Sequence, residues 1–152
     1  MNGETKNIVL GGVTYRMRPL GDADISALDQ WLKSRVIRIA CESLPENASE
    51  ADRRLTMESA ISFASSVTWM SGHGAKMLAT IDGMAQIVWQ GVRYHHPEVT
   101  PEEIRSKLLD PQTLDDARQA FEAANFRRKD KQEARKAGKR KNRKHKRKAT
   151  AG

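Results

Sequence analysis

The chain has 152 residues, of which 38% are apolar and 30% charged, and its formal net charge is +8. That charge is concentrated at one end: residues 127–152 hold 14 Lys and Arg and two acids, whereas residues 1–126 hold 13 Lys and Arg and 17 acids. We therefore expect one acidic folded domain over residues 1–126, large enough to bury its own core, and a separate Lys/Arg-rich tail over residues 127–152. No apolar run is long enough for a membrane span or a signal-peptide core, and the lone Cys41 excludes an internal disulfide, which favours a cytoplasmic protein.

A β-hairpin is predicted close to the N-terminus. Two β-favouring runs, Ile8–Leu10 and Val13–Met17, are joined by Gly11 and Gly12, a pair that permits the positive φ angles of a two-residue hairpin turn. Two strands alone are only marginally stable, so we expect the hairpin to pack on the helices that follow.

The hydrophobic period changes to that of a helix after the hairpin. A first amphipathic helix is expected from Asp22 to about Ser43, and a second begins after Ser49, which is a plausible N-cap. The candidate core residues of the second helix are Leu55, Ile61, Phe63, Ala64, Val67 and Met70.

Three further helices are expected before the tail. The third has the clearest pattern, with a buried seam that includes Leu78, Ile81 and Val88, and it ends before Pro97. Two short helices each begin at a proline, Pro101 and Pro111, that follows a capping residue. The predicted fold is therefore mainly α, a small domain of about five helices with an N-terminal β-hairpin and a basic, flexible C-terminal tail.

No residue pattern in this chain indicates a chemical reaction. The segment from Gly72 to Lys76 lacks the spacing of a phosphate-binding loop, and Lys76 is followed by Met77 with no hydroxyl for magnesium, so a helix–helix turn is favoured there. No Cys, Asp or Glu stands at a metal-ligand spacing from the histidines His73, His95 and His96. We expect no catalytic residue, no metal and no cofactor, and a protein that is not an enzyme.

Large apolar residues in the middle of the chain admit two interpretations. Three methionines recur at seven-residue intervals close to two tryptophans, a pattern that core packing explains most simply. Methionine-rich surfaces also accept varied partner helices, because the methionine side chain is adaptable. The candidate partner-binding residues are Trp69, Met70, Met77, Met84 and Trp89.

The tail has a separate candidate function. Eight strong cations fall within ten residues, and such a run attracts any polyanion, including DNA, RNA and acidic proteins. It contains no aromatic residue that would stack on bases, so sequence-specific recognition of single strands is not indicated. The candidate polyanion-binding residues are Lys139, Arg140, Lys141, Arg143, Lys144, Lys146, Arg147 and Lys148.

Two segments of the body resemble the tail assembly chaperones of long-tailed bacteriophages. The first is Leu10–Leu20 (LGGVTYRMRPL), followed by an acidic helix start and by Leu28–Trp31 (LDQW). The second is Ile87–Glu103 (IVWQGVRYHHPEVTPEE), in which a helix is followed by His-Pro and by the start of another helix. The resemblance covers about residues 8–125, and its motifs are structural signals without a catalytic element.

This resemblance implies a mainly helical protein that binds the tape-measure protein in the host cell cytoplasm. It would keep that long helical chain soluble while tail-tube proteins polymerise around it. In many such phages, a programmed frameshift adds a second domain that recruits the tube subunit. The alternative hypothesis is a nucleic-acid-binding protein that acts non-specifically through its basic C-terminal arm. Neither hypothesis involves a membrane, and oligomerisation is left open.

Overall fold

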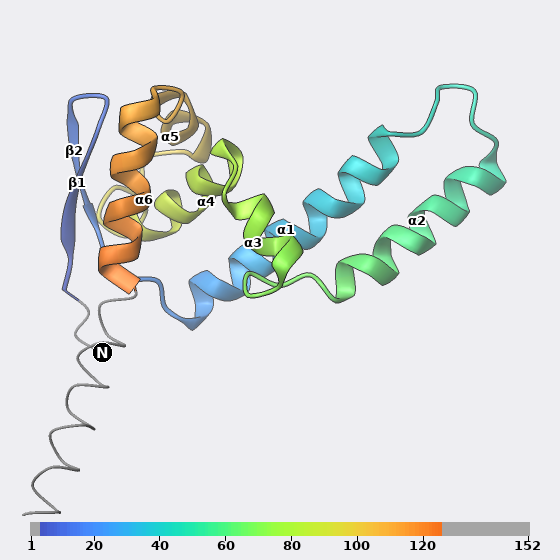
Figure 1. Ribbon diagram of the computed structural model, residues 1–152, viewed down its shortest axis with the longest axis horizontal. Coiled ribbons are helices and arrows are strands. Elements are labelled where there is room, and N and C mark those ends of the chain that lie inside the picture. Colours follow the sequence, from blue (N-terminus) through green and yellow to red (C-terminus); the bar gives the residue numbers. More distant parts are fainter. Residues whose placement is uncertain (1–3, 126–152) are drawn as a thin grey trace, which may run out of the picture.

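A computed structural model describes residues 4–125 of the chain (Figure 1). The predicted mainly helical fold with an N-terminal hairpin is confirmed. The basic tail, including the candidate polyanion-binding residues 139–148, lies outside the described residues. The elements in chain order are the strands β1 (Lys6–Leu10) and β2 (Val13–Met17) and the helices α1 (Asp22–Glu42), α2 (Glu50–Ser65), α3 (Gly72–Leu78), α4 (Ile81–Val92), α5 (Pro101–Lys107) and α6 (Pro111–Asn125).

The hairpin forms at the predicted place. Its strands are antiparallel, and Leu10 pairs with Val13 across a two-residue turn. Gly11 and Gly12 both have positive φ angles, 55° and 79°, which is the conformation that makes glycine favourable in this turn. One face of the ribbon contributes buried apolar side chains to the core, and the ribbon packs against α6 and α4 (Figure 1).

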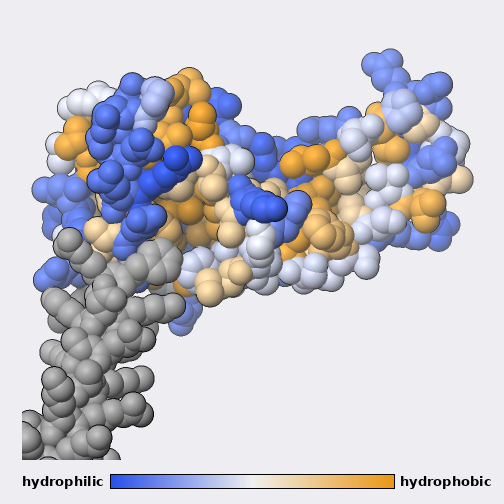
Figure 2. Space-filling model, viewed as in Figure 1, coloured by the Kyte–Doolittle hydropathy of each residue, from blue (hydrophilic) through white to orange (hydrophobic). Residues whose placement is uncertain are grey.

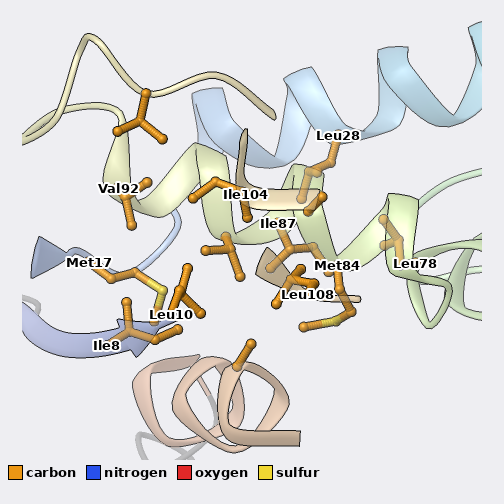
Figure 3. Close-up of a cluster of buried hydrophobic side chains, with 14 of the residues drawn as sticks. Ile8, Leu10, Met17, Leu28, Leu78, Met84, Ile87, Val92, Ile104 and Leu108 are labelled. Carbon is orange, nitrogen blue, oxygen red and sulfur yellow. The ribbon is translucent and has the colours of Figure 1, made fainter. Parts of the chain in front are cut away.

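The core is built around α4. Val88 and Val92 of this helix are completely buried, and side chains from the hairpin and from the other helices surround it (Figure 3). Met17 comes from β2, Leu28 from α1 and Ile104 from α5, and each is almost fully buried. A helix that carries apolar residues on several faces needs neighbours on several sides, and α4 has them.

The predicted third helix is in fact two helices. The seam residues Leu78 and Ile81 lie on α3 and α4, and the chain breaks between them because the Thr80 hydroxyl caps α4 by accepting a hydrogen bond from its third residue, Gly83. The predicted helix–helix turn from Gly72 to Lys76 was also wrong, since this segment forms the first turns of α3. Ser71 caps that helix in the same way, through the backbone N–H of Gly74.

The helices α1 and α2 form an antiparallel pair whose outer part projects away from the rest of the molecule (Figure 1). We call residues 33–65 the arm. Two predicted core residues of the second helix, Ala64 and Val67, are buried as expected. The prediction was wrong for the larger residues, three on α2 and one in the linker that follows it, which stay at the surface. The predicted core residues that are exposed are Leu55, Ile61, Phe63 and Met70.

A buried carboxylate fixes the start of α1 to the rest of the body. The side chain of Asp24 is fully buried and accepts hydrogen bonds from the backbone N–H of Gly21 (2.9 Å) and from Arg18 (2.8 Å). Arg93 and the hydroxyl of Tyr94 donate to its other oxygen at 3.3 Å. The end of β2, the start of α1 and the end of α4 therefore meet at one buried side chain.

Replacing Asp24 with alanine should lower the free energy of unfolding strongly. The substitution Asp24→Ala leaves two partly buried guanidinium groups without their shared acceptor, and breaking a buried pair in this way costs about 3–5 kcal/mol. Urea denaturation followed by circular dichroism measures the loss. Asp22→Ala, at an exposed acid in the same helical turn, should cost less than about 1 kcal/mol, and equal losses for the two variants would contradict the argument.

Candidate partner-binding groove

An apolar groove opens on the surface of the body where four helices meet. Its volume is about 380 Å³, and α1, α3, α4, α6 and the linker before α3 form its walls. Almost all of its lining is apolar, with charged groups on one side. The lining residues are Leu28, Trp69, Met70, Ala75, Leu78, Ala79, Met84, Ile87, Arg118, Phe121 and Glu122.

The groove brings together three of the five predicted partner-binding residues. Trp69 and Met70 line it from the linker, and Met84 lines it from α4. Met70 is 69% exposed, whereas Met84 is buried. Met77 does not line the groove and packs against the core. Trp89 does not line the groove either. Its indole N–H donates a hydrogen bond to the carbonyl of Val99 at 2.9 Å, which holds the ring on another side of α4.

The linker that carries Trp69 is held by hydrogen bonds at both ends. Asp29 on α1 accepts a hydrogen bond from the backbone N–H of Trp69 at 2.7 Å. Ser71 accepts one from the backbone N–H of Thr68 at 3.1 Å and donates one to the carbonyl of the same residue at 2.7 Å. These bonds fix the conformation of the linker, so its two large apolar side chains are offered to the groove from a defined position.

Residues of α6 complete the groove, and sequence reasoning did not assign them to it. Phe121 lies on the apolar stripe of the last helix, and core packing explains that stripe equally well. Arg118 and Glu122 lie one turn apart, and Arg118 donates a hydrogen bond to the carbonyl of Ala79 at 3.0 Å, joining α6 to the end of α3. Nothing local in the sequence indicates that these side chains meet the linker and α3.

The chemistry of the groove suits binding of apolar groups. Two methionines, a tryptophan and a phenylalanine contribute polarisable and aromatic surface, and one cation and one anion of α6 lie beside it. In the described part of the chain, no group of three or more His, Cys, Asp or Glu is placed to hold a metal ion.

The wall formed by α3 depends on a glycine that has no room for a side chain. A Cβ atom at Gly74 would lie 1.9 Å from the carbonyl oxygen of Thr68, which is backbone and cannot move aside cheaply. A Cβ atom at Gly72, two residues earlier in the same helix, would meet nothing within 4 Å. The close approach at Gly74 brings α3 against the linker.

Gly74→Ala should therefore destabilise the protein, by about 1–3 kcal/mol, because the added methyl group forces the linker away from α3. Gly72→Ala is the matched control and should be neutral or slightly stabilising, since alanine favours helix. Thermal unfolding of the two variants tests this difference. If the two midpoints agree, the close packing of α3 on the linker is not what holds this wall.

A second hollow, of about 280 Å³, has a polar lining and lies between α1, α4 and α5. Asp82 at the start of α4 accepts hydrogen bonds there from Arg35 of α1 and from Arg105 of α5. The hydrogen bond from Arg105 is the largest influence that lowers the pKa of Asp82, and the charge of Arg35 lowers it further against the opposing effect of burial. Because one carboxylate joins three helices, we interpret this hollow as a structural ion-pair network.

The Asp82 network should stabilise the fold in a pH-dependent way. Since the pKa of Asp82 is lower in the folded state, its contribution is complete at neutral pH and is lost as the pH falls through the lowered value. Asp82→Asn should cost about 1 kcal/mol at pH 7, and the difference from the wild type should shrink below about pH 4. Urea denaturation across pH measures both effects. Asp116→Asn, at an exposed acid of α6, should show neither.

Comparison with known proteins adds no relative: no protein-family model, no curated protein and no solved structure matches this chain. Among residues 4–125, no helix combines the length and the apolar character that crossing a membrane requires. The fold and the groove define the class as a mainly helical domain with an apolar surface groove and a projecting arm.

Proposed function

We propose that this chain binds an amphipathic helix of another protein in the groove, and that it is a phage tail assembly chaperone whose partner is the tape-measure protein. The observation that carries the proposal is the apolar groove beside α3, with Trp69 and Met70 on its exposed side. The sequence resemblance over residues 8–125 supports the more specific identity and the host cytoplasm as the place of action.

The dimensions of the groove fit this kind of ligand. A volume of about 380 Å³ falls within the range of specific pockets and accommodates one or two large apolar side chains. An amphipathic helix presents such side chains at three- and four-residue steps and can lay its apolar stripe across a groove of this kind. The partner's polar face would remain in water, so binding would cover the part of the partner that promotes aggregation.

The composition of the groove favours a partner with many related binding segments. Methionine changes conformation at low cost, so a groove containing Met70 and Met84 adapts to different apolar side chains. A tape-measure protein is a long helical chain, and several copies of a small adaptable chaperone could cover successive stretches of it. Recognition of the tail-tube protein is a further expectation from the resemblance.

The basic tail supports a second candidate, binding of nucleic acid. Its net charge of +12 contrasts with the net charge of −4 of residues 1–126, so the tail alone supplies the attraction to polyanions. The two functions require different parts of the chain, and one experiment separates them.

The test is co-expression with the tape-measure protein of the same phage, followed by affinity capture in the presence of nuclease. The baits are the full chain, residues 1–126, and full-length Met70→Asp. We expect residues 1–126 to capture the partner and keep it soluble, and Met70→Asp to weaken capture about tenfold or more, because a charge enters the apolar groove.

The matched control is Leu109→Asp, which places the same charge at an apolar residue that is 57% exposed and does not line the groove. This variant should capture the partner as the wild type does. If capture requires residues 127–152 and disappears with nuclease, the protein acts through nucleic acid and the groove is not its binding site.

A further inference from the structure

The arm exposes more apolar surface than its own packing requires. Val36 of α1 and Ala60 and Ala64 of α2 are buried in this part of the molecule, and the two alanines let the helices approach closely. The longer side chains Met57 and Ile61 are 39% and 53% exposed. Figure 2 shows the resulting apolar areas on the surface of the arm, between polar regions.

Two rows of apolar side chains, one on each helix of the arm, meet at one contact, and we call these four residues the arm stripe. Met57 and Ile61 are four residues apart on α2, so they lie on the same side of that helix. Ile37 and Cys41 have the same spacing on α1. The sulfur atoms of Cys41 and Met57 are 4.0 Å apart, which joins the two rows across the helix pair.

The charges on the arm make this face complementary to a second copy of itself. Residues 33–42 of α1 carry three basic residues, one of which (Arg35) is already paired with Asp82, and one acid, whereas α2 carries three acids and two basic residues. In a two-fold pair, with α1 of one copy lying across α2 of the other, the more basic helix meets the more acidic one and the apolar rows face each other. Ile37 and Cys41 are half-buried, whereas Met57 and Ile61 stay exposed in residues 4–125, where the arm projects from the body (Figure 1).

We infer that two copies of this chain associate through the arm stripe to form a four-helix bundle. The inference rests on the arm alone and does not depend on the proposed function of the groove. A helix of 16 residues is about 24 Å long, and a face two helices wide is about 20 Å across, so each copy contributes about 500 Å². Both copies together bury about 1,000 Å², at the lower limit for a specific interface, so the dimer dissociates on dilution.

The experiment is sedimentation velocity on the full chain over a range of concentrations, in high salt and after nuclease treatment. The wild type should shift from monomer to dimer as its concentration rises. Ile61→Glu should stay monomeric throughout, with unchanged helicity and thermal unfolding. Leu55→Glu is the control: Leu55 is 64% exposed on the same helix, but it lies two residues from Met57 and therefore on nearly the opposite side.

The relative placement of the helices has its own test. A chain with its native Cys41 is mixed with a chain that carries Cys41→Ser and Ile61→Cys, and the mixture is treated with diamide as the oxidant. In the inferred pair, α1 of one copy crosses α2 of the other, so a disulfide should link the two different chains.

Three results would overturn the inference. The first is a wild-type chain that stays monomeric at every concentration. The second is a dimer that survives Ile61→Glu. The third is a disulfide mixture in which no bond links the two different chains. If the wild type stays monomeric and Ile61→Glu abolishes capture of the tape-measure protein, the arm stripe belongs to that partner instead.

Discussion

The fold depends on the burial of α4. Of its 12 residues, eight are buried, and every covering element takes its position from them. The position of the hairpin also depends on α4. A Cβ atom at Gly91 would lie 2.6 Å from the side chain of Met17, so β2 can approach the helix this closely only because Gly91 has no side chain. The carboxylates of Asp24 and Asp82 then tie the surrounding elements together at two places. Beyond the Arg35–Asp82 ion pair at its base, the arm projects away from α4, and large apolar residues of α2 remain exposed there.

Local signals in the sequence predicted the elements well. Gly11 and Gly12 permit the positive φ angles that a two-residue hairpin turn requires. Pro101 can begin a helix because the first helical residues have no intrahelical acceptor for their N–H groups, so its missing N–H costs no hydrogen bond. The break between α3 and α4 was missed because Leu78 and Ile81 keep the helical period across it. Hydrophobic periodicity indicates which residues lie on the same face. It does not indicate that the hydroxyl of Thr80, between Leu78 and Ile81, caps the start of a new helix.

The groove was only partly predictable for a related reason. The methionine and tryptophan pattern located Trp69, Met70 and Met84, but it gave the same weight to Trp89, whose indole N–H is used inside the body. The contribution of α6 depends on how the last helix returns to α3, a contact between residues far apart in the chain. The exposed residues of α2 were mispredicted for the same reason. An apolar stripe in a sequence does not indicate whether another element packs against it.

Under the proposed function, the groove and the arm together would let one small domain bind a very long partner. A single groove of about 380 Å³ holds one short apolar segment, and such a contact alone is weak. Two copies joined through their arms would carry two grooves on one rigid support, so the second segment of the partner would bind at a high effective concentration. A partner with one apolar segment would bind such a pair no more tightly than a single copy. A helix with many apolar segments would bind each pair more tightly, because both grooves could be filled. Because the inferred arm interface is small, such pairs would separate on dilution, and the proposed chaperone would leave when assembly replaces it with a more extensive contact.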